Sequence, residues 1–223
     1  MTRHANANRQ AIIDACLDME RIGINQGTSG NISVRQDDGL LITPTSKPYA
    51  EMEPQDIVFL RMDGTSEGPL RPSSEWRIHR DIYRERPDVH AIVHAHPIYA
   101  TTLAIMGRDI PPVHYMVAIF GGATVRCAPY ATFGTAELSE HALEALRDRR
   151  ACLLAHHGIV AAGKTLAHTM WLAAELEVLA RQYHGALQIG TPPLLSEEEI
   201  ARVLDKMREY GAAATETAKP FSR

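Results

Sequence analysis

The chain has 223 residues, of which 45% are hydrophobic and 22% are charged, a composition typical of a folded globular protein. This length is enough for one good-sized domain and short for two. The formal net charge of −4 at pH 7 argues against a nucleic-acid partner, and no apolar run reaches the roughly 18 residues that a membrane span needs.

The N-terminal part of the chain predicts one helix followed by short strands. Apolar residues recur at helical spacing over 7–22. Alternating segments at 31–35, 39–43 and 56–60 predict strands, and the Asp-Asp-Gly between the first two is a hairpin signal. We therefore expect the first two strands to pair in antiparallel fashion.

The middle of the chain predicts a helix, a strand and a second helix. The first helix covers 74–86, with Ser73 or Ser74 as its N-cap and a proline just past its end. The apolar run 91–96 stops at a proline, as a strand does where it enters a loop. A helix over 98–106 follows.

The C-terminal part predicts further elements of both kinds. In chain order they are a strand pair within 113–130, a helix over 139–149, a strand over 151–161, a long helix over 165–188 and a helix over 197–210. Ser196 and Glu199 are spaced as a capping box for the last helix, and Gly211 stands just past its expected end.

This order of elements predicts an α/β fold, in which helices cover both faces of a sheet of mixed strand directions. No repeat, low-complexity segment or linker divides the chain, so we expect a single domain over 1–223. The polar N-terminus lacks the apolar core of a signal peptide. Cys16, Cys127 and Cys152 are interpreted as buried free thiols, and we expect a cytoplasmic protein.

The most informative feature is a pair of histidines at the end of the 91–96 strand. Side chains alternate along a strand, so His94 and His96 point to one face, about 6–7 Å apart at the backbone. His157 ends a second apolar run, whereas His156 would face the other way in a regular strand. Three imidazoles with an open position are typical of catalytic zinc, although a lone strand histidine is more often a hydrogen-bonded core residue.

Small polar residues form candidate anion-binding loops. The glycine-bracketed stretch 27–31 offers two hydroxyls and an amide, and Ser73 with Ser74 opens a helix. Such loops are usually only turns, but together with Thr45-Ser46 they indicate a phosphate clamp. Lys47 is interpreted as a surface residue, so a metal-dependent route is favoured over a Schiff base.

Eight stretches carry a more specific signal. They are 25–35, 41–45, 72–76, 94–96, 110–116, 127–134, 156–158 and 195–200. In these stretches, which span nearly the whole chain in order, the sequence resembles the class II aldolase/adducin family. The resemblance implies a three-layer α/β/α domain with a mixed, largely antiparallel central sheet, assembled as a C4 homotetramer whose active sites are shared between neighbouring subunits.

The resemblance also implies roles for single residues. His94, His96 and His157 would hold one zinc ion per subunit, another divalent metal remaining open, with Glu75 as an acidic ligand and proton-transfer group. Two catalytic tyrosines match, Tyr115 from a neighbouring subunit and Tyr210 from the C-terminal tail. The substrate-binding residues would be Thr28, Gly30, Asn31, Thr45, Ser46, Ser73, Ser74 and Phe133, with Tyr130 beside Phe133.

The implied activity is that of a lyase. It would cleave a ketose 1-phosphate, such as L-fuculose 1-phosphate, reversibly to dihydroxyacetone phosphate and a small aldehyde such as L-lactaldehyde. Ser46 stands where the family pattern has glycine, and 212–215 lacks an expected basic residue. 5-Deoxyribulose or 5-methylthioribulose 1-phosphate is therefore an alternative substrate.

Other functions remain open on the same fold: another enzyme, namely a pentulose-phosphate 4-epimerase, a dehydratase or a decarboxylase, or a non-catalytic scaffold. A pentulose-phosphate 4-epimerase would carry an acid where His114 stands, immediately before Tyr115. A non-catalytic scaffold like the adducin head domain would lack the three metal-binding histidines. Both features favour the aldolase over the epimerase and the scaffold.

Overall fold

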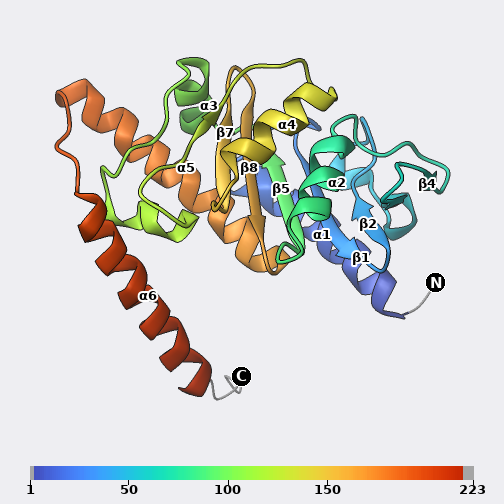
Figure 1. Cartoon of the computed structure of the whole chain (residues 1–223). Helices are drawn as coiled ribbons and strands as arrows, with labels where there is room; N and C mark the ends of the chain where they lie inside the picture. Colours follow the sequence, from blue (N-terminus) through green and yellow to red (C-terminus); the bar gives the residue numbers. More distant parts are fainter. Residues whose placement is uncertain (1–2, 218–223) are drawn as a thin grey trace.

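The computed structural model describes residues 3–217, and every strand in that range belongs to one sheet (Figure 1). The strand order is β4-β3-β2-β1-β5-β8-β7-β6, and all neighbours are antiparallel except β6 and β7. This mixed, largely antiparallel sheet confirms the expected fold class. The strands are β1 Asn31–Gln36, β2 Gly39–Ile42, β3 Val58–Arg61, β4 Ser66–Glu67, β5 Ala91–Ala95, β6 Cys127–Ala128, β7 Ala151–Leu154 and β8 Gly158–Gly163.

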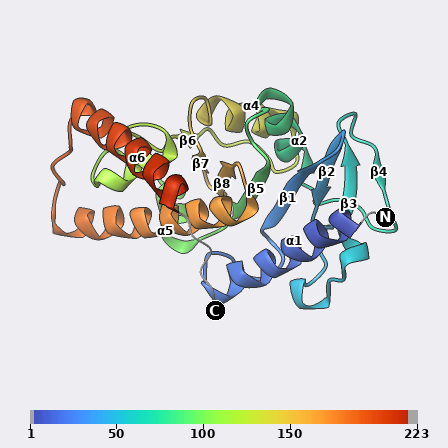
Figure 2. The same cartoon turned by 90° about the horizontal axis from the view of Figure 1, so that it is seen from below.

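Helices cover both faces of the sheet, as predicted. α1, α3 and α5 bury their apolar side chains in one core, and α2 and α4 do so in a second core. Figure 2 shows α1 and α5 on one side of the strands and α2 and α4 on the other. The helices are α1 Arg3–Arg21, α2 Trp76–Glu85, α3 Ile98–Ile105, α4 Ala136–Ala145, α5 Leu166–Ile189 and α6 Glu197–Thr217, with 3-10 helices η1 Tyr49–Glu51, η2 Pro54–Asp56 and η3 Tyr115–Phe120.

The apolar pattern of the sequence explains where these elements pack. Ile12, Cys16 and Met19 follow helical spacing and are fully buried, which places one face of α1 against the sheet. β5 lies between β1 and β8 in the middle of the sheet, and all five of its residues are buried. Because both of its faces are covered, β5 is a continuous apolar run instead of an alternating one.

Helix α2 begins later than predicted, and neither Ser73 nor Ser74 is its N-cap. The N-cap is Glu75, and no side chain caps the helix there. The Ser73 hydroxyl instead accepts a hydrogen bond from the backbone N–H of Glu75, at 3.3 Å. A serine can bond a backbone group two residues away in a turn, and this local bond competes with its use as a helix cap.

Two strand predictions were wrong. The segment 113–130 forms no strand pair, because its apolar run folds into η3, whose last four residues are buried, and Gly121 ends that turn at a left-handed φ of 97°. Only β6 remains of it as a strand. The run 151–161 is also two strands, because His156 adopts a φ of 55° and turns the chain between β7 and β8.

The boundaries of two helices also differ from the predictions. α4 starts three residues earlier than expected, where the Thr135 hydroxyl accepts from Leu138 N–H at 3.2 Å. α6 does not stop at Gly211 but continues to Thr217, since the alanines that follow the glycine are strong helix formers. It packs against η3 and leans outward from the sheet (Figure 1). Within residues 3–217, no helix combines the length and apolar character of a membrane span.

Candidate functional site

The structure brings four predicted metal ligands together from three parts of the chain. His94 lies on β5, His96 follows its end, and His157 lies in the turn between β7 and β8. Glu75 occupies the N-cap position of α2. One ligand atom from each residue falls in a cluster whose members all lie within 4.8 Å of one another. The cluster therefore matches the set of ligands that the sequence predicted.

Sheet pairing explains why these side chains meet. β8 is antiparallel to β5, so Ala95 at the end of β5 lies opposite Ile159 at the start of β8. A Cβ at Gly158 would lie 2.5 Å from the Ala95 carbonyl oxygen and 2.6 Å from the His96 ring. Only glycine allows the turn that carries His157 to approach the histidine pair this closely.

Hydrogen bonding fixes the orientation of the most buried imidazole. His94 is 1% exposed, and its Nδ1 lies 2.8 Å from the Ile159 carbonyl oxygen. Because a carbonyl only accepts, Nδ1 carries a proton, and in the neutral form of the ring Nε2 therefore holds the lone pair that a metal ligand needs. That Nε2 lies 2.9 Å from both His96 Nε2 and Glu75 Oε2. Lone pairs and a carboxylate that face each other in this way fit a cation between them.

The charges in the cluster are strongly coupled. Burial alone would raise the pKa of Glu75, but the charge of His94 and the contacts with His157 and His94 hold it well below its usual range. Burial, together with the charges of His94 and His157, lowers the pKa of His96 to about 3. Glu75 is thus a carboxylate and His96 is neutral at pH 7, which is the protonation state that metal ligation requires.

These residues fit a divalent metal. Oε1 of Glu75 is buried and makes no hydrogen bond, although His157 Nε2 is 3.1 Å away. A buried carboxylate oxygen without a donor is costly unless a cation satisfies it. Three imidazole nitrogens and one carboxylate oxygen form a donor set that zinc accepts, and the hydrogen bond at Nδ1 of His94 supports its ligand geometry.

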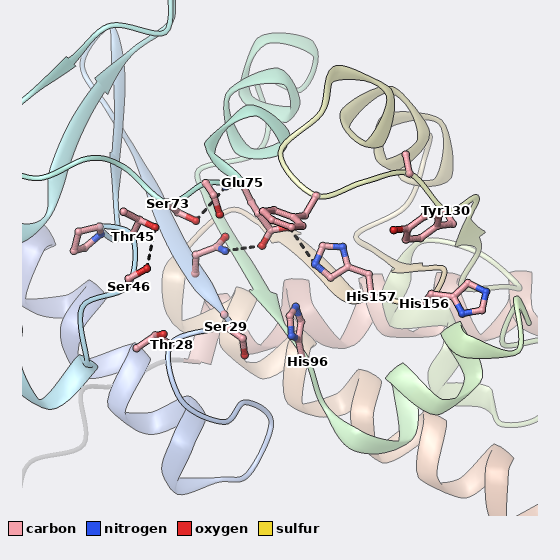
Figure 3. Close-up of a pocket in the computed structure, with 16 residues that line it drawn as sticks. Thr28, Ser29, Thr45, Ser46, Ser73, Glu75, His96, Tyr130, His156 and His157 are labelled. Atoms are coloured by element: carbon pink, nitrogen blue, oxygen red, sulfur yellow. Dashed lines mark hydrogen bonds and ion pairs between the residues drawn. The ribbon is translucent and has the colours of Figure 1, made fainter.

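A cavity of about 350 Å³ opens beside the cluster (Figure 3). Hydroxyl groups lie on one side of Glu75, and aromatic rings lie on the other. Every predicted substrate-binding residue lines it, namely Thr28, Gly30, Asn31, Thr45, Ser46, Ser73, Ser74 and Phe133. Ser29, Pro44, Tyr130, Ala131 and His156 also line the cavity, and Figure 3 shows Tyr130 and His156 on the side away from Thr28, Thr45 and Ser46.

Two of the predicted clamp residues also serve the metal cluster. The Asn31 side-chain amide donates to Glu75 Oε2 at 3.0 Å, and the Ser73 hydroxyl accepts from the Glu75 backbone. Ser46 adopts a φ of 58°, a left-handed conformation that glycine takes without strain. A glycine at this position would adopt the same backbone conformation without that strain.

Two neighbours of the cluster bear on the sequence interpretation: His156 faces away from the ligands as expected, although from a turn, whereas Lys47 differs from it. His156 points away from His157 and packs edge-on against the Tyr130 ring, because it lies in a turn and not in a strand (Figure 3). Lys47 is not a free surface residue, since its ammonium donates to Asp56 at 2.6 Å and both side chains are largely covered. That pair anchors the loop that carries Ser46.

The two predicted catalytic tyrosines lie outside this cavity or outside the described side chains. Tyr115 begins η3, is about half exposed, and is absent from the cavity lining. Tyr210 belongs to α6, but its side chain lies outside the described part of the structure. Neither position tests the predicted role.

Sequence reasoning missed the support that surrounds Glu75. His79 lies one helical turn after Glu75 and is fully buried, with Nε2 at 2.5 Å from Asn31 Oδ1. The signal available in the sequence was the histidine at i+4 from the glutamate on a helix. Residues four apart share a helix face, so Glu75 and His79 should lie together on the side of the helix that faces the sheet.

Comparison with known proteins identifies close relatives. Residues 10–184 match the model of the Class II Aldolase and Adducin N-terminal domain. The chain is 52% identical to a 5-methylthioribulose-1-phosphate/5-deoxyribulose-1-phosphate aldolase of Rhodospirillum rubrum, over 96% of this chain and 97% of the relative. It is equally identical, at 52%, to the L-fuculose phosphate aldolase of Escherichia coli K12, over 92% and 96%. A solved structure of an L-fuculose 1-phosphate aldolase superposes with a TM-score of 0.88 at 38% identity, covering 91% of this chain and 96% of that one.

Proposed function

The chain belongs to the class II aldolase and adducin family and is an aldolase, which is a kind of lyase. On this basis we propose its substrate, its metal and its assembly. The proposed reaction is the reversible cleavage of a ketose 1-phosphate to dihydroxyacetone phosphate and a small aldehyde. The proposed metal is one zinc ion per subunit, held by His94, His96, His157 and Glu75.

One observation carries this proposal, namely the order of groups along the cavity. Glu75 and the histidines lie between the loops that carry Thr28, Thr45 and Ser46 on one side and Tyr130 on the other (Figure 3), and Phe133 lines the same cavity. A ketose 1-phosphate has the same order, with a phosphate at one end, a carbonyl near it and an aldehyde-forming part beyond. The substrate can therefore be bound with each part against groups of matching chemistry.

The chain's own residues perform the binding and the proton transfers. Thr28, Thr45 and Ser74 are exposed hydroxyls that can donate to a phosphate and fix the ketone half in the cavity. When bound, zinc supplies Lewis-acid polarisation of the ketose carbonyl. Glu75 is ionised, and we propose that it takes and returns the proton at C3 of dihydroxyacetone phosphate.

We propose that Tyr115 handles the proton at the C4 oxygen from a neighbouring subunit of a C4 homotetramer. Tyr115 is half exposed and absent from the cavity of its own chain. Ile98, Ile105 and Met106 form an exposed apolar surface on and just after α3, which follows His96 directly. A large exposed apolar patch often marks a protein contact, and a contact here would place another subunit beside the metal end.

A mixing experiment tests this shared site. Inactive Tyr115→Phe subunits combined with inactive His94→Ala subunits should regain part of the activity, because some cavities then combine an intact metal cluster with an intact tyrosine. Recovery should follow the statistical fraction of such cavities, and complete failure to recover would count against the assembly. The site draws residues from Thr28 to His157 into one cavity, which also supports the proposal of a single domain over 1–223.

Two relatives of equal identity leave three sugar phosphates to compare. The relatives at 52% identity are named for L-fuculose phosphate and for 5-methylthioribulose and 5-deoxyribulose 1-phosphates. We propose that both kinds are turned over, since the hydroxyl loops hold the shared phosphate end. Tyr130 and Phe133 line the cavity and are 59% and 63% exposed, and we propose that they contact the aldehyde part, where this exposure leaves room for aldehydes of different polarity.

A substrate panel tests the proposal. The measured quantity is kcat/KM for L-fuculose 1-phosphate, 5-deoxyribulose 1-phosphate and 5-methylthioribulose 1-phosphate, with release of dihydroxyacetone phosphate as readout. A pentulose 5-phosphate is the matched control, because its phosphate lies at the wrong end for the hydroxyl loops. Efficient 4-epimerisation of that control without release of dihydroxyacetone phosphate would overturn the assigned reaction. We also propose the cytoplasm as the location, in line with the three free cysteines.

A further inference from the structure

A chain of polar side chains is buried between β1 and α2, beneath the metal cluster. Its members are almost completely shielded from solvent: Asn31 is 3% exposed, Ser33 and His79 are 0% exposed, and Tyr83 is 2% exposed. Asn31 and Ser33 are two apart on β1, whereas His79 and Tyr83 are four apart on α2. These spacings place each pair on one face of its element, so that the two faces meet.

Hydrogen bonds connect these side chains into one continuous path that starts at Glu75. Asn31 Nδ2 lies 3.0 Å from Glu75 Oε2, and Asn31 Oδ1 lies 2.5 Å from His79 Nε2. On the other side of the ring, His79 Nδ1 lies 2.7 Å from the Ser33 hydroxyl. That hydroxyl in turn lies 2.9 Å from the Tyr83 hydroxyl.

The charge on Glu75 determines the direction of every bond in this path. A carboxylate only accepts, so the amide of Asn31 must face it with nitrogen and present its oxygen to His79. His79 must then carry its proton on Nε2, which leaves Nδ1 to accept from Ser33. The oxygen of Ser33 accepts in turn from Tyr83. All donors therefore point toward Glu75, and each bond polarises the next.

The far end of the path is anchored. The Arg35 guanidinium lies 4.8 Å from the centre of the Tyr83 ring and donates to the backbone carbonyls of Tyr83, Arg86 and Val89. Burial, together with the charge of His94, lowers the pKa of His79 to about 3. His79 is therefore neutral at pH 7 and keeps one donor and one acceptor nitrogen.

We propose that His79 is a positioning residue, which acts through Asn31 to fix the rotamer of Glu75 at the metal end of the cavity. Without a donor on Nε2 of His79, the amide of Asn31 loses the bond that selects its orientation. The amide can then turn its oxygen toward the Glu75 carboxylate, and the two oxygens repel each other. Glu75 has no side-chain donor other than Asn31 and the metal-binding histidines among the contacts of the described residues.

Two substitutions of His79 separate this role from simple packing. In His79→Gln the amide nitrogen reaches the place of Nε2 and keeps the donor to Asn31. In His79→Asn the shorter amide reaches only the place of Nδ1 and loses that donor. We expect His79→Asn to weaken zinc affinity and to lower kcat by about 10- to 100-fold. We expect His79→Gln to change both by no more than about fivefold, the effect of one neutral hydrogen bond.

Tyr83→Phe is the matched control at the far end of the path, because it removes one hydroxyl and keeps the ring under Arg35. It should change zinc affinity less than His79→Asn does. If His79→Asn and His79→Gln fold and bind zinc equally well, the proposal is wrong. Activity in this series rests on the proposed function, whereas zinc affinity is measured without substrate and tests the positioning role separately.

The tautomer of His79 gives a test that needs no variant. Nitrogen-15 NMR of the metal-free and the zinc-loaded protein distinguishes a proton on Nε2 from a proton on Nδ1. We expect the Nε2–H form in both states, with no titration of the ring between pH 6 and pH 8, an interval set around the ordinary histidine pKa of about 6.5. The Nδ1–H form would reverse the direction of the path and overturn the proposal.

Discussion

The metal end and the hydroxyl end of the cavity are built in opposite ways. At the metal end, His94 and Glu75 are 1% and 5% exposed, and they are positioned by a central strand and by a helix N-terminus. At the hydroxyl end, Thr28, Thr45 and Ser46 are exposed and lie on loops. Buried hydrogen bonds hold the side chains at the metal end in place. The positions of the side chains at the hydroxyl end depend on the loop backbone and on contact with the substrate.

This difference has a physical reason. A metal requires several ligands at fixed distances, so small displacements are costly and the supporting residues must be rigid. A phosphate accepts hydrogen bonds from many directions, and exposed hydroxyls can adjust to it. We therefore expect changes at the metal end to abolish function, and changes at the hydroxyl end to alter affinity or stability by small amounts.

The largest effect is expected for His94→Ala. His94 touches His96 and Glu75 and is held by the Ile159 carbonyl, so its loss removes a ligand and the element that orients the others. Bound zinc and cleavage activity should both be lost, as measured by elemental analysis and by release of dihydroxyacetone phosphate. His156→Ala is the control, because His156 packs on Tyr130 outside the cluster and should leave zinc content unchanged. Full activity in a metal-free His94→Ala protein would contradict the claim that the metal end is essential for function.

A smaller effect is expected for Thr45→Val at the hydroxyl end. The Thr45 hydroxyl is exposed, and its only side-chain hydrogen bond within residues 3–217 is to Ser46 Oγ at 3.4 Å, so the described fold does not depend on it. A hydrogen bond to a charged group is worth about 1.5–3 kcal/mol, so KM should rise by about tenfold or more while zinc content is unchanged. Thr191→Val, an exposed threonine between α5 and α6, is the control. An unchanged KM would place the phosphate elsewhere.

Lys47→Met tests whether the hydroxyl end is held by charge. Burial raises the pKa of Asp56, but hydrogen bonds from Lys47 and from the Glu53 backbone lower it below its usual range. A carboxyl whose folded pKa is depressed stabilises the protein above its unfolded pKa of about 4, and this stability is lost as the pH falls through the folded value. The variant should lose about 0.5–1 kcal/mol at pH 7.

The pH dependence checks the cause of that loss. The difference in Tm between the wild type and Lys47→Met should be constant from pH 6 to pH 7 and should shrink as the pH falls below about 4, the unfolded pKa, and through the lower folded pKa of Asp56 in the wild type. A difference that persists unchanged at pH 3 would assign the effect to packing of the lysine stem instead of the ion pair.

The smallest effect is expected for Ser46→Gly. A left-handed conformation costs a non-glycine residue about 1–2 kcal/mol, and glycine loses about 0.5–1 kcal/mol more conformational entropy on folding. The variant should therefore be more stable by about 0.5 kcal/mol, a rise in Tm of about 1–2 °C for a chain of this size. Ser29→Gly, an exposed serine without a positive φ, is the control and should not gain stability. A loss of stability in Ser46→Gly would mean that the serine hydroxyl holds the loop.

Local sequence patterns were sufficient for much of the fold. The hairpin turn at Asp-Asp-Gly, the apolar face of α1 and the continuous apolar run of β5 each depend on neighbouring residues, and each was predicted as the right kind of element. The pairing of His94 with His96 was also predictable, since residues two apart on a strand share a face. Local preference failed at 113–130 and at 151–161, where apolar residues serve a 3-10 turn and a hairpin equally well.

What the sequence determined by itself was the set of residue types and their local spacing, and hence the family, the metal-binding histidines and the hydroxyl loops. Only the tertiary structure decided how these local pieces meet. The antiparallel pairing of β5 with β8 brings His157 to the histidine pair, and the packing of α2 on β1 connects Glu75 with Asn31 and His79. Such contacts join residues 40 and more positions apart in the chain, and their energies depend on burial, which no local pattern contains.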